Sequence, residues 1–127
     1  MPPYNVATHK EGYQRKFHDL CDQFIKKNNS LLFLKKHTEI VDNLLIKLWT
    51  DSNVSEKNTL IAVGGYGRNE LFPYSDVDLL VLTNEKSIEN DPLVLAYKGL
   101  LKKICPKIII GIQPSVEFCT AAKQLGI

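Results

Sequence analysis

Residues 61–82 contain two short apolar runs separated by a glycine-rich turn. The first run ends at Gly64 and Gly65, and the second contains Asp76 and Asp78 at its start. Short apolar runs bounded by turn residues are typical of buried strands. Because side chains alternate across a strand, two carboxylates at positions i and i+2 are expected on the same face. The segment therefore predicts a strand, a glycine turn and a second strand that begins with two acidic side chains.

The rest of the chain predicts helices around these strands. Apolar residues recur at helical spacing in the N-terminal part, and Ser30 is expected to cap the second helix there. The predicted helices span residues 8–27, 31–49, 66–71, 92–104 and 117–125. The predicted strands span residues 59–63, 77–82 and 107–112. This order predicts an α+β fold in which helices pack on a small mixed β-sheet after two N-terminal helices.

Composition limits the classes of partner and the location of the protein. The chain has 127 residues and a formal net charge of +2, which gives no support for a nucleic-acid or membrane partner. Cys21, Cys105 and Cys119 are odd in number and widely spaced, so they indicate free, buried thiols rather than disulfides or a zinc site. Together with the lack of a signal-peptide pattern, these thiols predict a cytoplasmic protein.

The glycine turn is suited to phosphate binding. Glycine lets the backbone turn sharply and approach a phosphate with no β-carbon in the way. The N–H groups of residues 65–67, near a helix start, are expected to donate to phosphate oxygens. A Gly-Gly pair after a strand is weak support by itself, because such turns are common, and it gains weight from the acidic pair that follows.

The acidic pair indicates a divalent cation. Asp76 and Asp78 on one face repel each other when both are charged, and a cation between them removes that cost. Mg²⁺ prefers carboxylate oxygens together with substrate phosphates, as in nucleotidyl transfer. In the alternative interpretation, one aspartate caps a turn and the other is merely exposed at the strand edge.

Further polar residues lie in the same motif. Arg68 is suited to bidentate phosphate binding, although an exposed helix position or an ion pair with Glu70 would explain it equally. Ser75 is expected to donate to a phosphate or to cap the turn before the second strand. Tyr66 and Tyr74 bracket the loop, and packing is favoured over base stacking for both.

The three histidines give no indication of a metal site. They have no cysteine or carboxylate at ligand spacing, so each is expected at the surface or half-buried. They are His9, His18 and His37.

The motif GGYGRNELFPYSDVDLLVL resembles the signature of the bacterial protein-PII uridylyltransferase/uridylyl-removing enzyme family. This family belongs to the DNA polymerase β-like nucleotidyltransferase superfamily, and its pattern GGYGRxELxPxSDxDLL is matched here at each fixed position. Residues 41–49 also resemble the helix before that motif, and residues 114–116 weakly resemble a later segment of the family. The resemblance implies an N-terminal helical segment over residues 1–50 and an incomplete nucleotidyltransferase domain over residues 51–127.

The resemblance implies transfer of UMP from UTP to a tyrosine of the PII nitrogen-regulatory protein, with Mg²⁺ and release of pyrophosphate. It makes Asp76 and Asp78 the catalytic metal ligands. The residues that bind the nucleotide would be Gly64 and Gly65, which match the family's nucleotide loop; Arg68 and Ser75 join them on the reasoning from residue chemistry given above.

Two departures from the family pattern bear on activity. The family has a third acidic residue in an apolar strand, where this chain has Gly111, and Glu117 is a weak substitute. The family enzyme is also several times longer, so the chain is expected to be an amino-terminal piece without uridylyl-removing activity or glutamine sensing. Two other functions stay open: a minimal stand-alone nucleotidyltransferase of the antitoxin type, and a nucleotide-binding module without turnover.

Overall fold

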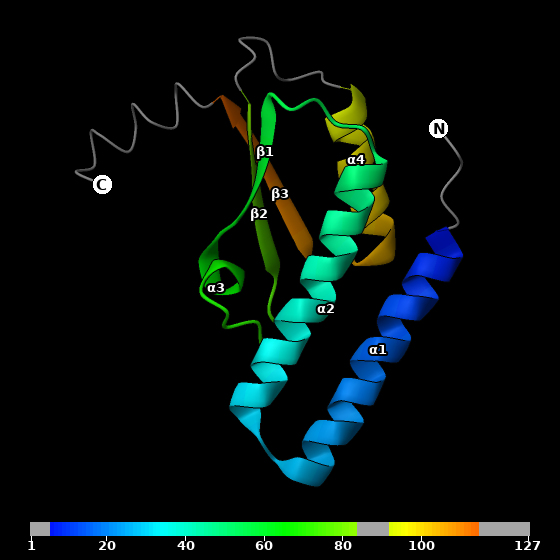
Figure 1. The fold of residues 1–127 in the computed structure, drawn as a ribbon, viewed down its shortest axis with the longest axis vertical. Coiled ribbons are helices and arrows are strands. Elements are labelled where there is room, and N and C mark those ends of the chain that lie inside the picture. Colours follow the sequence, from blue (N-terminus) through cyan, green and yellow to red (C-terminus); the bar gives the residue numbers. More distant parts are fainter. Residues whose placement is uncertain (1–5, 84–91, 115–127) are drawn as a thin grey trace, which may run out of the picture.

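The computed structural model describes residues 6–83 and 92–114 of the chain. Its first half is a hairpin of two long helices, α1 (Val6–Lys27) and α2 (Ser30–Asp51), which run antiparallel to each other (Figure 1). Both helices were predicted, and both extend slightly beyond the predicted bounds.

Two asparagines make the turn of the helical hairpin. Asn28 has a φ of 50°, and its N–H donates to the Phe24 carbonyl at 2.7 Å, which ends α1. Asn29 is extended, and its Oδ1 accepts a hydrogen bond from the Leu32 N–H at 3.1 Å. Ser30 is already the first residue of α2, so the prediction that Ser30 caps this helix is wrong. Because Asn28 is left-handed, the chain is already extended at Asn29, and this residue caps α2 one position earlier than predicted.

The second half forms a three-stranded mixed sheet in the order β1 (Asn58–Ala62), β2 (Val77–Thr83), β3 (Ile108–Pro114). β1 pairs with β2 antiparallel, and β2 pairs with β3 parallel. Helix α4 (Pro92–Ile104) lies between β2 and β3 in the chain. The predicted α+β fold with a small mixed sheet is confirmed. The predicted helix over 117–125 lies outside the described residues.

The sheet has two different faces. Val77, Leu79 and Val81 of β2 are at most 4% exposed and share one core with residues of α2 and α4, which lie on the same side of the sheet (Figure 1). The alternate residues of β2 point to the other side, and strand pairing adds residues of β3 to them. We call this second side the open face; its residues include Asp78, Leu80, Leu82, Ile109 and Gly111.

Helix α2 contributes directly to the core that supports the sheet. Val41, Leu45 and Leu48 of α2 are almost fully buried in the same cluster as the β2 side chains. The Tyr97 hydroxyl of α4 donates to the Leu45 carbonyl at 3.0 Å. The division of the chain at residue 50 stays a prediction, and side chains from both sides of that position share this core.

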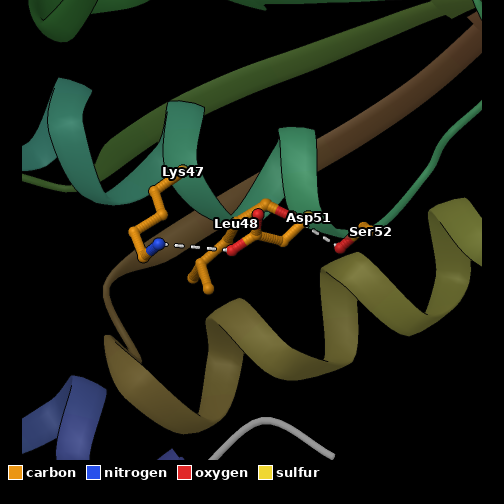
Figure 2. A network of polar contacts seen from close by, with 4 residues as sticks. All are labelled: Lys47, Leu48, Asp51 and Ser52. Atoms are coloured by element: carbon orange, nitrogen blue, oxygen red, sulfur yellow. Dashed lines mark hydrogen bonds and ion pairs between the residues drawn. The ribbon is translucent and has the colours of Figure 1, made fainter. Parts of the chain in front are cut away.

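The C-terminal end of α2 is closed by local polar contacts (Figure 2). The Ser52 hydroxyl donates to the Leu48 carbonyl at 2.6 Å, and the Ser52 N–H donates to the same carbonyl. Lys47 and Asp51, one helical turn apart, form an exposed ion pair at 3.5 Å. These contacts carry the helix two residues beyond its predicted end at residue 49.

Two observations concern the predicted cytoplasmic location, which stays a prediction. Cys105 is buried and Cys21 is half-buried, and both are free thiols; Cys119 lies outside the described residues. Within residues 6–83 and 92–114, no helix combines the length and apolar character that crossing a bilayer requires.

Candidate active site

A single helical turn, α3 (Gly64–Gly67), follows β1 at the end of the sheet where β2 begins (Figure 1). Gly64 has a φ of +61°, and a Cβ built on it would lie 2.7 Å from Oδ2 of Asp78. Only glycine combines this backbone conformation with so close an approach of a carboxylate. The structure therefore brings the predicted glycine turn and one of the two predicted aspartates into direct contact.

The position of α3 differs from the sequence prediction of a helical turn over residues 66–71. The turn begins at the glycines themselves and ends at Arg68, whose N–H donates to the carbonyls of Gly64 and Gly65, at 3.2 Å each. Asn69 then has a φ of 59°, and the Glu70 N–H returns to the Gly65 carbonyl at 2.8 Å. The left-handed residue at 69 stops the helix, so the predicted span is wrong.

A second close approach fixes how α3 leaves β1. A Cβ built on Gly67 would lie 2.8 Å from the Ala62 carbonyl oxygen. The Gly67 N–H donates to the Val63 carbonyl at 3.0 Å, and the Val63 N–H donates to the Asp78 carbonyl at the same distance. The backbone around the turn is therefore tied to both strands.

The two aspartates lie at the start of β2, on either side of a core residue. Val77 is 0% exposed and packs into the core, whereas Asp78 is half-buried on the open face. Asp76 precedes the strand and is exposed to solvent. The described residues contain no group of three or more His, Cys, Asp or Glu side chains arranged to hold a metal ion. These two carboxylates fit Mg²⁺, because this ion commonly keeps several waters and takes one or two protein carboxylates plus substrate phosphates.

Strand register shows which residues of β3 lie beside the acidic pair. Asp78 pairs with Ile109, and Leu80 pairs with Gly111. The side chain of Ile109 is 48% exposed on the open face. The position nearest to Asp78 on β3 is therefore apolar, while Gly111 lies two pairs further along the strand.

The other predicted nucleotide-binding residues, Arg68 and Ser75, lie in the segment between α3 and β2. Arg68 Nε donates to Oε2 of Glu70 at 3.4 Å, and both side chains are more than half exposed. This is the ion pair that the sequence left open as an alternative, and the left-handed Asn69 makes it possible at a spacing of two residues. The Ser75 N–H donates to the Phe72 carbonyl at 3.1 Å, which closes a turn just before Asp76.

Sequence reasoning missed the side chains that connect this region to the rest of the fold. The Tyr66 hydroxyl of α3 donates a short hydrogen bond to Asp42 of α2. Burial and this hydrogen bond raise the pKa of Tyr66, so its hydroxyl stays protonated. Tyr66 is 4% exposed, which agrees with the packing role favoured from sequence, whereas Tyr74 is 97% exposed. His37 is fully buried, so the prediction of a surface or half-buried residue is wrong for this histidine.

Comparison with known proteins agrees with this geometry. The chain matches the nucleotidyltransferase domain family over residues 45–122. It belongs to this family. The matched region contains the glycine turn, both aspartates and β3. It begins inside α2, the helix whose Asp42 accepts the hydrogen bond from Tyr66.

Three similar curated proteins carry the same name. The chain is 40% identical over 81 residues to the bifunctional uridylyltransferase/uridylyl-removing enzyme of Nitrosospira multiformis, a match that covers 64% of this chain and 8% of that protein. It is 47% identical over 73 residues to the enzyme of that name from Ralstonia nicotianae, covering 55% and 8%. The corresponding protein of Hydrogenovibrio crunogenus is 48% identical over 67 residues, covering 50% and 7%. The chain thus spans less than a tenth of the length of these relatives. No solved structure matches the chain.

Proposed function

We propose that this nucleotidyltransferase moves UMP from UTP to a tyrosine hydroxyl of a PII-type regulatory protein and releases pyrophosphate. In this reaction the phenolic oxygen forms a bond to the α-phosphorus, the bond from that phosphorus to pyrophosphate breaks, and the phenolic proton passes to water. The observation that carries the proposal is the contact between the backbone of Gly64 and the carboxylate of Asp78. The names of the similar proteins support uridylyl transfer. UTP and PII as the substrates rest on the resemblance of the motif to the protein-PII uridylyltransferase family.

The glycine turn is suited to hold the triphosphate. The first turn of any helix leaves N–H groups without partners inside the helix, and these groups donate readily to phosphate oxygens. In α3 these donors are the N–H groups of Gly65 and Tyr66, and the Tyr66 side chain is buried away from the turn's exposed surface. The Gly67 N–H, which was also expected to bind phosphate, already donates to the Val63 carbonyl. Arg68 is exposed next to it and would add a bidentate contact to a phosphate.

The acidic pair would bind the metal. Asp76 and Asp78 are the residues that would hold Mg²⁺, together with phosphate oxygens of the substrate. When bound, this ion neutralises charge on the phosphates and favours departure of pyrophosphate. The half-buried carboxylate of Asp78 lies close to the backbone of Gly64 and would orient the nucleotide relative to the turn.

The direct test is transfer of label from [α-³²P]UTP to PII in the presence of Mg²⁺. We expect labelling by the chain and a loss of at least about 100-fold in Asp78→Asn, because an amide is a poor ligand for a hard cation. Asp22→Asn is the matched control, since it makes the same chemical change on the exposed side of α1 and should leave labelling unchanged. The proposal is wrong if the Nitrosospira multiformis enzyme labels PII under these conditions and this chain does not.

A nucleotide-binding protein without turnover is the second candidate. Ile109, which pairs with Asp78, favours it because this apolar side chain offers no ligand or base beside the acidic pair. Calorimetry distinguishes the two candidates. Binding of Mg·UTP without release of pyrophosphate supports the second, and binding that survives the double change Asp76→Asn with Asp78→Asn contradicts the proposed site.

A further inference from the structure

The segment that joins α3 to β2, residues 68–76, is bound by two side chains from distant parts of the chain. We call this segment the connecting loop. His37 of α2 lies with its Nδ1 2.8 Å from the Leu71 carbonyl oxygen. Lys107, the residue just before β3, donates from Nζ to the Pro73 carbonyl oxygen at 2.8 Å. Each contact joins residues that are 34 positions apart in the sequence.

The hydrogen bond of His37 determines the state of its ring. A carbonyl oxygen only accepts, so Nδ1 must carry the hydrogen. The residue is 0% exposed, and its Nε2 has no hydrogen-bond partner among the described residues. Burial lowers the pKa of His37, and the positive charge of Lys107 lowers it further, while the bond to Leu71 acts in the opposite direction. The ring is therefore neutral near pH 7 and acts as a fixed donor to the loop.

Lys107 binds the connecting loop and the strand that follows it. Its backbone carbonyl accepts a hydrogen bond from the Val77 N–H at 3.1 Å, in addition to the side-chain bond to Pro73. The ammonium group also lies 5.3 Å from the ring centre of Phe17 in α1, which holds the side chain in place. Pro73 and Val77 flank Asp76, so a single residue binds the backbone on both sides of this carboxylate.

We propose that His37 and Lys107 are positioning residues for the active site, because their bonds to Leu71 and Pro73 hold Asp76 next to Asp78. Neither side chain would touch the nucleotide. Backbone hydrogen bonds to α3 restrain the first three residues of the loop. Between them and Asp76, the further restraints are local turns, including the one closed by Ser75, and the buried side chain of Leu71, and most of the loop is exposed. This inference rests on the proposed function where it assigns Asp76 to the metal. The claim that His37 and Lys107 hold the connecting loop in place is independent of that assignment.

The test combines a measurement of the loop with a measurement of the metal site. Amide hydrogen exchange of Ser75 and Val77 by NMR reports the loop, and binding of Mn²⁺ followed by electron paramagnetic resonance reports the acidic pair. In His37→Leu and in Lys107→Met, we expect exchange at these two amides to be roughly 3 to 10 times faster, the effect of losing one hydrogen bond. The Mn²⁺ dissociation constant should rise by a similar factor, while exchange of the Leu80 amide in the sheet stays unchanged.

Three further variants separate positioning from a general loss of structure. His37→Asn keeps an N–H donor near the place of Nδ1 and should restore both readouts. Lys102→Met is the matched control for Lys107, because Lys102 also donates to a proline carbonyl, that of Pro106 at 3.4 Å, away from the loop. His18→Leu is the exposed histidine control.

Each outcome decides one part of the inference. Faster loop exchange together with weaker Mn²⁺ binding supports it fully. If loop exchange is faster in the variants but the wild-type protein binds no Mn²⁺, the role of the two side chains in holding the loop is supported and the proposed function is overturned. Unchanged loop exchange in Lys107→Met and His37→Leu overturns the inference, and so does faster exchange with unchanged Mn²⁺ binding.

Discussion

The two faces of the sheet are built from the same strands and differ in almost every property. On the helix-covered face, Val77, Leu79 and Val81 are closely packed against α2 and α4. On the open face, Asp78 and Leu80 are only half-buried, and Ile109 is half exposed. The difference shows that the side chains of one face contribute most of the apolar burial of this strand, while those of the other face stay partly accessible to solvent. Substitutions at neighbouring positions of the same strand should therefore have very different effects.

The largest effect is expected from a charge placed on the helix-covered face. Val81→Asp puts an unpaired carboxylate in the core, which should cost at least about 4 kcal/mol of unfolding free energy, a large part of the total for a domain of this size. Leu82→Asp, one residue further on the open face, should cost less than about 1 kcal/mol. Urea unfolding followed by circular dichroism measures both. Equal losses would contradict the difference between the faces.

The next largest effect is expected at the glycine turn. Gly64→Ala should cost about 1 to 3 kcal/mol, because alanine is strained at a φ of +61° and its Cβ would collide with Asp78. It should also abolish metal-dependent binding of UTP by displacing that carboxylate. Gly99→Ala in α4 is the control, since a Cβ there meets nothing within 4 Å and should stabilise the helix by about 0.5 to 1 kcal/mol. Thermal unfolding and calorimetry with Mg·UTP test both variants.

A smaller effect is expected from pH through His37. Its pKa is lowered in the folded protein from the ordinary value of 6.5, so the unfolded chain binds more protons below that pH. The stability that depends on neutral His37 should therefore be complete above about pH 6.5. Below that pH the free energy of unfolding should decrease as the pH falls toward 5.5. His37→Asn should remove this part of the decrease, whereas the exposed-site variant His18→Asn should keep it. Urea titrations at pH 7.5 and 5.5 measure the difference, and identical slopes in all three proteins would contradict it.

The smallest effect is expected from the exposed ion pairs. Glu70→Gln breaks the pair with Arg68, and both side chains are more than half exposed, so stability should change by no more than about 0.5 kcal/mol. Asp51→Asn, which breaks the exposed pair with Lys47, should behave in the same way. Thermal unfolding at low and high salt is the measurement. A loss above about 1 kcal/mol for Glu70→Gln alone would assign to this residue a structural role beyond its ion pair with Arg68.

Much of the fold was accessible from the sequence because its signals are local. A short apolar run after the turn residues identified β2, and Pro92 marked the start of α4 correctly. The order of strand, glycine turn and acidic strand was also predicted, whereas the close approach of Asp78 to Gly64 comes from the structure alone. The errors were also local in origin: Asn28 and Asn69 adopt left-handed conformations, which moved the cap of α2 and ended α3 earlier than predicted.

The supports of the candidate site could not be predicted in this way. The bonds from His37 to Leu71 and from Tyr66 to Asp42 connect residues 34 and 24 positions apart, and no pattern in the sequence marks either pair. The pairing of Ile109 with Asp78 depends on the register of two parallel strands, which the hydrophobic pattern alone does not determine. The burial of His37 did have a signal in the sequence, because this residue lies on the apolar face of the predicted second helix.

The contacts of helix α2 have a consequence for transplanting this nucleotidyltransferase domain into another scaffold. Its residues His37 and Asp42 precede position 45, where the family match begins, yet they bond to the two segments that present the glycines and the acidic pair. A graft that copied only the matched portion would leave the Tyr66 hydroxyl and the Leu71 carbonyl without their partners. The smallest segment that can be transferred therefore includes the whole of this helix. Chimeric proteins joined at a position within the helix should misfold.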